Sequence, residues 1–353
     1  MVTIVDDDSA TGLPVRWKSA ENGGLSEPGD TVQTMTALTA SQLDRARGAL
    51  IGCAVGDALG VPYEFGPRLS AADDPVMRGG GLGDVAPGEW SDDTSRAFAV
   101  ARAAAEHHDL TTPAALDAVA AGFLDWFATD PPDVGIQTRR VLDTARRGTA
   151  MRDAADDLML QGARTAGNGA LMRTAPVALA HLHDRARLAD AARAVARLTH
   201  YDPQAGDSCV LWCEAIRIAV LESRIDVYAG LDLIPADRRD EWSTLLDAAR
   251  ENDPATFTPN GYTVTALQAA ASSILHAVGD RGDHVRNALY TAVRIGDDTD
   301  TVAAIAGSLL GARWGVSAFA EQWREAVHGW PRDGDRPSTA ADLLDLADRI
   351  TTA

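Results

Sequence analysis

The chain has 353 residues, of which 46% are hydrophobic and only 5% aromatic, and its formal net charge is −19 at pH 7. The length and the share of apolar residues exclude a disordered chain and predict one large domain or two ordinary ones. The strong negative charge argues against a basic surface, so we expect neither a nucleic acid nor a membrane as partner.

The N-terminal segment differs in composition from the rest of the chain. Residues 1–38 are polar and show no hydrophobic periodicity, so we predict a mobile polar tail. The segment begins MVTIVDDDSA, which lacks the basic stretch and the apolar run of a secretory signal. The sequence has no run of about 18 uncharged apolar residues, and its three cysteines form no C-x-x-C pair. We therefore expect a cytoplasmic protein with buried free thiols.

The first helix is predicted from TASQLDRARGALIGCAVGDALG, where Thr39 or Ser41 can cap the N-terminus. Glycine recurs at every fourth position of this segment, at Gly48, Gly52, Gly56 and Gly60. Glycine costs about 1 kcal/mol per helical position relative to alanine. Four glycines on one face therefore predict a neighbouring element packed very close to this helix.

A long Gly- and Pro-rich segment, residues 62–90, is predicted as an ordered loop, and loops of this length are often functional. Glu64 lies near its start, between Tyr63 and Phe65. Its carboxyl group could act as a general acid or base, or it could be an ordinary surface carboxylate.

Helical patterns dominate the remainder, usually separated by proline, glycine or Asx. They cover roughly residues 94–108, 113–128, 135–147, 150–161, 169–182, 186–198, 206–223, 242–250, 262–278, 283–293, 301–312 and 318–328. No convincing alternating strand is present. The sequence predicts a compact all-α fold with a single domain over residues 39–332, in which 231–260 is an insertion or lobe, followed by a C-terminal helix or tail over 333–353.

Two helix starts carry more acidic and hydroxyl groups than capping requires. WSDDT, residues 90–94, and DDTDT, residues 297–301, each begin a helical pattern. One or two such groups are explained by capping and by the helix dipole. The surplus indicates a site for a hard cation such as Mg²⁺, with Ca²⁺ or a plain acidic rim as alternatives.

A third motif is GNG, residues 167–169, which precedes an apolar helical pattern. Glycines at a helix N-terminus can expose backbone N–H groups to a diphosphate, although a plain turn is also consistent with so short a motif. Gly135 could likewise be a turn glycine, and His200 could be a core, capping or ligand-binding histidine.

Together these motifs resemble the ADP-ribosylglycohydrolase family. The resemblance runs from about Leu43 to Trp330 and rests on five segments in order: GALIGCAVGDALGVPYEFG, WSDDT, GNGALMRTAP, LTH and IGDDTDTVAAIAGSLLGARWG. It implies a compact all-α fold with a two-metal centre, usually Mg²⁺ and sometimes Mn²⁺. It also implies an enzyme that removes ADP-ribose from protein side chains by cleaving the C1″ bond.

The resemblance also assigns roles to residues of this chain. The implied metal ligands are Ser91, Asp92, Asp93, Asp298, Asp300 and Thr301. The implied proton-transfer group is Glu64, with Asp93 as the other carboxylate that could serve. The positions implied to hold ADP-ribose are Gly135, Gly167, Asn168 and His200, and Gly169 completes the GNG cradle. Asp297 stands where relatives often have glycine, and its role is open.

The modified side chain is predicted from the loop PPDVG. Arginine-directed relatives tend to carry an acid in this loop, and Asp133 could pair with a guanidinium group. We therefore expect a monomeric enzyme that acts on an ADP-ribosylated protein, at arginine first and at serine second. ADP-ribosylated small molecules or nucleic acid ends are further alternatives.

Three other classes of protein share some of these features but fit the sequence less well. A terpenoid-synthase-like enzyme also uses acidic helix motifs, but the chain has no D-D-x-x-D motif. His183-Asp184 hints at an HD-type phosphohydrolase, but no matching histidine pair is evident. A non-catalytic ADP-ribose-binding relative would be expected to have lost a ligand position, and here every such position is occupied.

Overall fold

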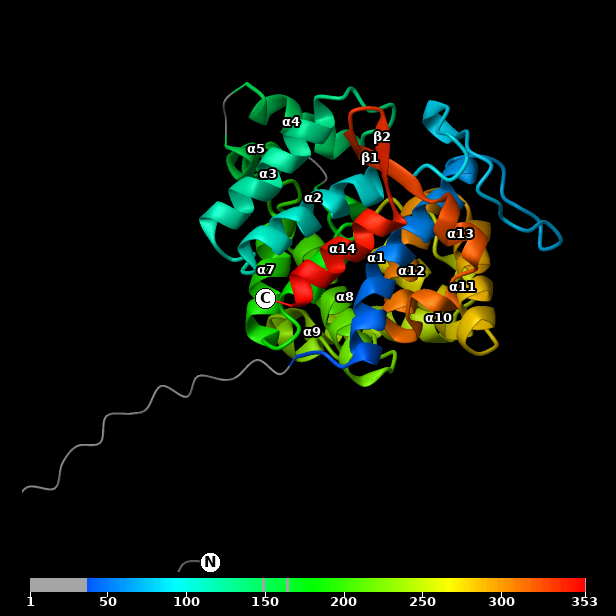
Figure 1. Ribbon diagram of the computed structural model, residues 1–353. Coiled ribbons are helices and arrows are strands. Elements are labelled where there is room, and N and C mark those ends of the chain that lie inside the picture. The colour runs from blue at the N-terminus through cyan, green and yellow to red at the C-terminus, as the bar shows by residue number, and fades with distance from the viewer. Residues whose placement is uncertain (1–36, 148–149, 163–164, 353) are drawn as a thin grey trace, which may run out of the picture. The chain divides into compact units, whose positions relative to one another are not determined.

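The computed structural model describes residues 37–147, 150–162 and 165–352, and most of these lie in α-helices (Figure 1). Residues 1–36 of the predicted tail lie outside the described part. The helices are α1 (Ala40–Gly60), α2 (Asp92–His107), α3 (Pro113–Phe127), α4 (Ile136–Ala145), α5 (Met151–Leu160), α6 (Ala175–Ala180), α7 (Arg185–Ala196), α8 (Pro203–Glu222), α9 (Arg239–Glu251), α10 (Thr263–His276), α11 (Arg281–Ile295), α12 (Thr299–Trp314), α13 (Glu321–Ala326) and α14 (Ala340–Thr351). The predicted all-α class is confirmed.

Helices α1 and α12 run side by side through the core, in contact along most of their lengths (Figure 1). Thr39 begins α1 with a capping box that includes Gln42, as the sequence predicts. The glycine face of α1 lies directly on the backbone of α12. A Cβ atom added at Gly52 would lie 2.0 Å from the carbonyl oxygen of Gly307, and one at Gly56 would lie 2.0 Å from that of Ala303. The glycines are thus required by the close approach of two backbones, as the sequence predicts.

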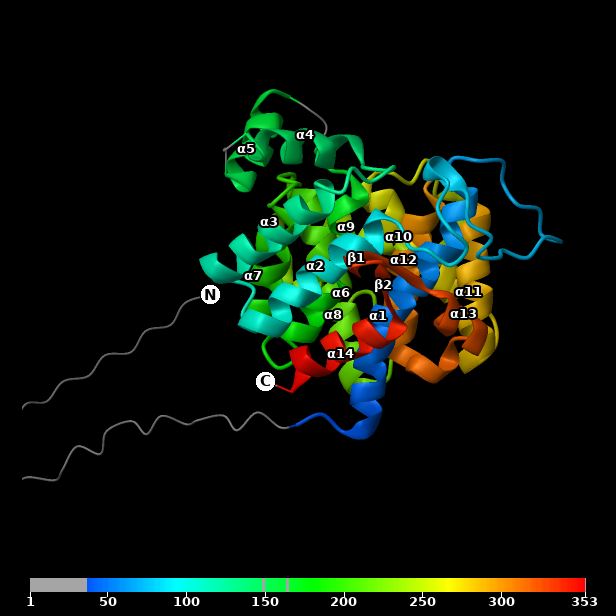
Figure 2. The ribbon, with the colours of Figure 1, turned by 45° about the horizontal axis from the view of Figure 1, so that its top comes forward.

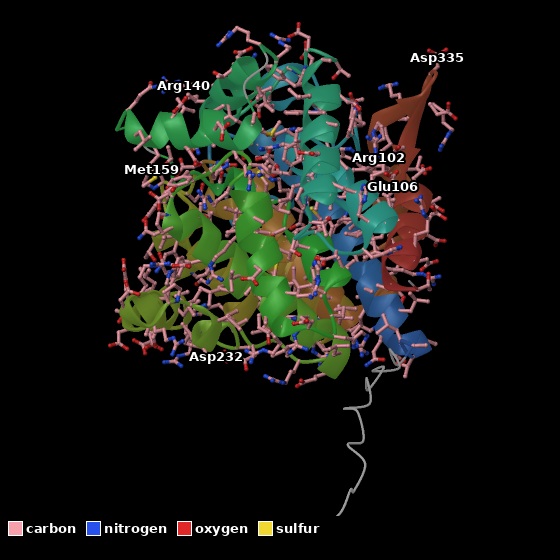
Figure 3. The ribbon with its side chains drawn as sticks, turned by 90° about the vertical axis from the view of Figure 1, so that its left-hand side faces the viewer. Arg102, Glu106, Arg140, Met159, Asp232 and Asp335 are labelled. Carbon is pink, nitrogen blue, oxygen red and sulfur yellow. The ribbon has the colours of Figure 1, made fainter. Side chains whose placement is uncertain are left out.

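The other helices pack around this central pair. Helix α2 contacts α3, α6 and α14, helix α8 contacts α7 and α12, and helix α10 contacts α9, α11 and α12. Helices α4 and α5 stand together at one end of the domain, and α10 and α11 lie on the other side of α12 (Figure 2). Charged side chains such as Arg102, Glu106 and Asp232 point outward from the bundle (Figure 3). In the described part of the chain, no helix is long and apolar enough to span a lipid bilayer.

The predicted helix over 169–182 is wrong in part. The structure instead has a 3₁₀ turn over Asn168–Ala170, and α6 begins only at Ala175. Pro176 explains the break, because proline has no N–H group to donate to the carbonyl four residues earlier, so a helix cannot continue through it unperturbed. Pro176 is therefore placed in the first turn of α6, where no intrahelical N–H donor is needed.

The C-terminal region contains the strands that the sequence did not reveal. Strands β1 (His328–Asp333) and β2 (Arg336–Thr339) form an antiparallel hairpin across the boundary predicted at 332/333. Helix α14 follows and buries Leu343, Leu346 and Ile350 against α1 and α2. The segment 231–260, predicted as an insertion or lobe, forms α9 and three 3₁₀ turns. It contributes Ile234, Trp242, Leu246 and Ala249 to the hydrophobic core.

Candidate active site

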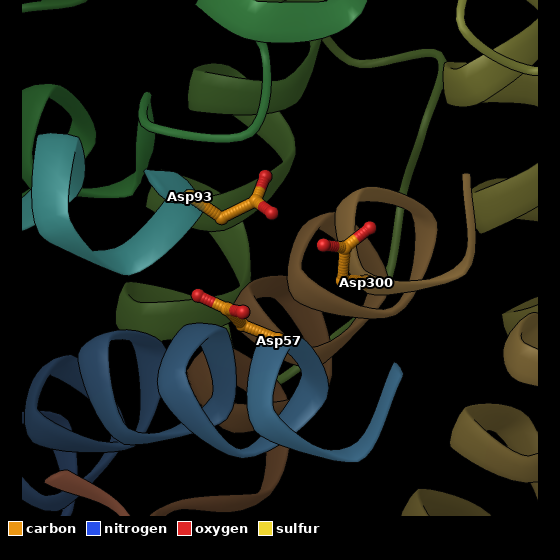
Figure 4. A group of neighbouring side chains, drawn as sticks. All are labelled: Asp57, Asp93 and Asp300. Atoms are coloured by element: carbon orange, nitrogen blue, oxygen red, sulfur yellow. The ribbon is translucent and has the colours of Figure 1, made fainter. Parts of the chain in front are cut away.

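Three carboxylates from three different helices meet at the centre of the domain. Asp57 lies near the C-terminal end of α1, Asp93 in the first turn of α2 and Asp300 in the first turn of α12. Their side chains point toward one another (Figure 4). One oxygen of each lies within 4.8 Å of the others, and all three residues are buried. The structure thus brings Asp93 and Asp300 together as the sequence predicts, and it adds Asp57.

A second carboxylate group shares one member with the first. Oxygens of Glu64, Asp298 and Asp300 also lie within 4.8 Å of one another. Asp300 belongs to both groups, so the two clusters of carboxylates are contiguous. Together they could hold more than one cation.

Asp57 holds the acidic N-terminus of α2 in place. Its carboxylate accepts hydrogen bonds from the backbone N–H groups of Ser91 and Thr94, both at 2.9 Å, and from the Thr94 hydroxyl at 2.6 Å. Asp57 therefore acts as a cap supplied from another helix, which satisfies N–H groups that α2 cannot satisfy itself. Sequence reasoning missed this residue. The available signal was a lone acid inside the apolar, glycine-rich segment of α1.

Hydroxyl groups orient Asp93 from two sides. The Ser91 hydroxyl donates to one oxygen of Asp93 at 3.1 Å, and the Thr301 hydroxyl of α12 donates to the other at 3.1 Å. The two acidic helix starts are thus joined directly. Asp92 forms a 2.5 Å ion pair with the buried guanidinium of Arg96.

Two asparagines fix the loop that carries Asp298. Asn260 accepts a hydrogen bond from the Asp298 backbone N–H at 2.9 Å and donates to the Gly296 carbonyl at 3.1 Å. Asn168 donates to the Asp298 carboxylate at 2.8 Å. Asn260 is another residue that the sequence analysis did not single out, because nothing local distinguishes it from a turn asparagine.

Asp297 has a conformational role in the same loop. Its φ angle is +60°, in the left-handed region that favours glycine and that Asp and Asn tolerate best among the other residues. Its carboxylate accepts a hydrogen bond from Thr258, and its carbonyl accepts one from the N–H of Phe65 at 2.7 Å. The backbone geometry thus gives Asp297 a conformational role, which the sequence left open.

Burial and mutual repulsion disfavour negative charge on these carboxylates. Burial raises the pKa of Asp57 to about 6. Burial, followed by repulsion from Asp133, raises the pKa of Glu64 to about 9. Burial and neighbouring carboxylates also raise the pKa of Asp93 and Asp300 well above their usual range. A bound cation would remove this penalty, and carboxylate and hydroxyl oxygens are the ligands that hard divalent cations prefer. The residues present therefore fit a divalent metal centre.

The carboxylate centre opens into a large cavity of about 1120 Å³. Its lining includes all of the predicted substrate-binding residues, which lie in the loop before α4, in the GNG turn and after α7: Asp133, Gly135, Gly167, Asn168, Gly169 and His200. Glu64, Asp92, Asp298 and Thr301 line the same cavity. Ligand pockets usually have volumes of about 300–1,000 Å³. This cavity is therefore large enough for a ligand of nucleotide–sugar size.

The predicted helix-dipole cradle at GNG is not present in the expected form. Only a 3₁₀ turn follows Gly167, and the N–H of Asn168 already donates to the Gly261 carbonyl at 3.1 Å. What lies beside the two glycines is the ring of His200. A Cβ atom added at Gly167 or Gly169 would lie 3.3 or 3.2 Å from its Nε2 atom. The glycines therefore leave room next to this imidazole.

An all-α domain whose buried carboxylate centre fits a divalent cation and borders a large cavity has features expected of a metal-assisted hydrolase. The ADP-ribosylglycohydrolase family matches residues 38–353, and the chain belongs to this family of glycosidases.

Relatives and a solved structure agree with this assignment. The chain is 29% identical over 323 residues to the ADP-ribosylarginine hydrolase Tri1 of Pseudomonas putida, covering 87% of this chain and 80% of the relative. It is 31% identical over 293 residues to the ADP-ribosyl-[dinitrogen reductase] glycohydrolase of Rhodospirillum rubrum, covering 79% and 89%. A solved ADP-ribosylglycohydrolase-related protein complex superimposes with a TM-score of 0.66 at 27% identity, covering 89% and 99%. The chain is therefore an enzyme that hydrolyses ADP-ribosyl bonds.

Proposed function

We propose that this enzyme removes ADP-ribose from arginine side chains of modified proteins, and that it uses two Mg²⁺ ions. The observation that carries the proposal is the position of Asp133, which lines the same cavity as Glu64 and Asp298. Burial, followed by repulsion from Asp92 and Asp298, raises the pKa of Asp133 to about 6. A guanidinium group placed beside Asp133 would neutralise the carboxylate charge and could donate two parallel hydrogen bonds to it. The names of the relatives from Pseudomonas putida and Serratia proteamaculans, both ADP-ribosylarginine hydrolases, support the same substrate.

The proposed ion ligands are the acidic and hydroxyl groups at the starts of α2 and α12: Ser91, Asp92, Asp93, Asp298, Asp300 and Thr301. When bound, the ions would supply Lewis-acid stabilisation and orient the reacting groups. Hydroxyl groups donate hydrogen bonds to both oxygens of Asp93, and Asn168 donates one to the Asp298 carboxylate. These bonds hold the two proposed ligands in fixed orientations.

Glu64 is the carboxyl group best placed to move a proton. None of the described residues hydrogen-bonds its side chain, and it lines the cavity beside Asp298. Cleavage of a glycosidic bond develops positive charge at the anomeric carbon and needs a proton at the leaving group or removed from the attacking water. We assign that proton transfer to Glu64.

The test compares synthetic peptides that carry ADP-ribosyl-arginine or ADP-ribosyl-serine, each incubated with the enzyme and Mg²⁺. We expect faster release of ADP-ribose from the arginine peptide. Asp133→Asn should lower kcat/KM for that peptide by roughly 10- to 100-fold, because a hydrogen bond to a charged group contributes about 1.5–3 kcal/mol. Asp130→Asn is the matched control, since Asp130 is exposed in the same loop and does not line the cavity. Preference for the serine peptide, or an equal effect of both substitutions, would contradict arginine specificity.

A further inference from the structure

His200 has one ring nitrogen engaged and one facing the cavity. The side chain is only 2% exposed, and its Nδ1 atom lies 2.7 Å from the Thr199 hydroxyl oxygen. Its Nε2 atom lies beside Gly167 and Gly169, and no described residue forms a hydrogen bond with it. Because His200 lines the cavity, Nε2 is the nitrogen that a bound ligand can reach.

The hydrogen-bond partners of Thr199 decide which nitrogen carries the proton. The fully buried guanidinium of Arg173 donates to the Thr199 hydroxyl oxygen at 2.8 Å. Arginine has donors only, so Thr199 accepts this bond and has one hydrogen left to donate. The remaining partner among the described residues is Nδ1 of His200. If Nδ1 donated instead, the buried Thr199 hydroxyl hydrogen would have no acceptor among the described residues, so Nδ1 accepts and the neutral ring carries its proton on Nε2.

The charge state of the ring agrees with this chain of bonds. Burial, followed by the nearby Arg173 and Arg96 guanidinium groups, lowers the pKa of His200 well below its usual value. The imidazole is therefore neutral at physiological pH, and a neutral imidazole has one donor and one acceptor nitrogen. Without the hydroxyl of Thr199, either tautomer could form.

Arg173 also brings positive charge to this wall of the cavity. Its other contacts are the Gly169 carbonyl at 2.7 Å, the Val195 carbonyl at 3.2 Å and the face of Phe123 at 4.6 Å. None of the carboxylates in the described residues forms an ion pair with it. Burial lowers the pKa of Arg173 to about 9, so it is still charged at neutral pH. A buried cation without an acidic partner favours an anion nearby.

We propose that Arg173 and Thr199 are positioning residues that hold His200 in the Nε2–H tautomer, so that Nε2 donates a hydrogen bond to an anionic oxygen of the ligand's diphosphate. The identity of the ligand rests on the proposed ADP-ribosyl hydrolysis, whereas the tautomer does not. Because the net charge of the chain is −19, long-range attraction does not bring an anionic ligand to the protein. This relay of Arg173, Thr199 and His200 provides a hydrogen-bond donor and a positive charge locally.

The experiment measures the tautomer and the binding separately. In protein with ¹⁵N-labelled histidine, long-range ¹H–¹⁵N spectra report the tautomer of each ring, and His200→Asn assigns the signal. We expect the Nε2–H form in the wild type, its loss or mixing in Thr199→Val, and its recovery in Thr199→Ser. The dissociation constant of ADP-ribose with Mg²⁺ should rise about 10-fold or more in Thr199→Val and return in Thr199→Ser.

Thr174→Val is the matched control. Thr174 is an equally buried threonine whose hydroxyl contacts Cys213, and it does not line the cavity, so its loss should leave the His200 spectrum and the ADP-ribose affinity unchanged. A wild-type ring in the Nδ1–H form, or a Thr199→Val variant with unchanged spectrum and affinity, would overturn the proposal. If the wild type has the expected tautomer but binds no ADP-ribose, the positioning of His200 by Arg173 and Thr199 is supported. The assignment of ADP-ribose as the ligand and the proposed function would then both be wrong.

Discussion

Gly52→Ala should destabilise the protein although alanine is the better helix former. Gly52 lies in the middle of α1, where an added Cβ atom would lie 2.0 Å from the Gly307 carbonyl oxygen and 2.8 Å from the ring of Phe319. Ordinary contact begins at 3.4 Å, so α1 and α12 would have to move apart by about 1.4 Å at this point. A gap of 0.5–1 Å already forfeits a quarter to a half of the dispersion energy of the atoms concerned.

The magnitude follows from the extent of this contact. Overpacking of a dense core costs about 1–3 kcal/mol and sometimes more. Because the obstruction is backbone rather than a flexible side chain, we expect a loss near the upper end, about 3 kcal/mol. With an unfolding entropy of about 2.1 cal/mol/K per residue over roughly 300 residues, this corresponds to a fall in Tm of about 5 °C.

The same displacement should reach the active site. Asp57 and Asp300 lie on the two helices that would separate. We expect Mg²⁺ to bind about 10- to 100-fold more weakly, as is typical when the support of a metal ligand is disturbed. Circular dichroism during heating measures the stability, and titration calorimetry measures the Mg²⁺ affinity.

Gly206→Ala in α8 provides a control of opposite sign. A Cβ atom at Gly206 would meet only the Arg193 Cγ atom at an ordinary 3.5 Å. This variant should therefore gain about 0.5–1 kcal/mol from helix propensity. If Gly52→Ala were as stable as Gly206→Ala and bound Mg²⁺ normally, the close-contact explanation of the glycine repeat would be wrong.

Three further predictions concern the carboxylate centre. Asp300→Asn should weaken Mg²⁺ binding more than about 100-fold in calorimetry and leave the helical circular dichroism unchanged. Asp297 lies outside both carboxylate groups, so Asp297→Asn should bind Mg²⁺ normally. Equal binding by the two variants would show that Asp300 is not a metal ligand. Glu64→Gln should lower kcat at least ~10²-fold while ADP-ribose still binds. Near-normal turnover of this variant would instead assign the proton transfer to Asp93. The folded pKa values of Asp57 and Glu64, about 6 and about 9, exceed the ordinary pKa values of these side chains, 3.8 and 4.5, so the folded state binds more protons than the unfolded state. The metal-free protein should thus lose stability as the pH rises from about 4 to about 9, as chemical denaturation can measure, and saturating Mg²⁺ should remove most of that loss; a rise in metal-free stability over this range would contradict the arrangement.

The sequence by itself determined the features that depend on neighbours along the chain. Helical periodicity, the capping box at Thr39 and the every-fourth-residue glycines follow from the local geometry of a helix, and they predicted both the fold class and the close contact of α1. The acidic helix starts are likewise recognisable from adjacent positions in the sequence. Because a cluster of like charges needs compensation, the surplus of aspartates in DDTDT by itself indicates a cation site.

Tertiary structure decided which groups meet. Asp57 and Asp93 lie 36 positions apart in the chain, and only the packing of α1 against α12 and the start of α2 brings them together with Asp300. The hydrogen bond from Arg173 to Thr199 likewise joins two turns that lie 26 positions apart in the chain, whereas Thr199 and His200 are neighbours in sequence. Pro176 shows the reverse case, in which a local signal interrupts a helix that periodicity predicts to be continuous. Local patterns set which elements form, because they act within a turn or two of backbone. The site depends on how closely those elements approach, and that distance is set by packing across the whole core.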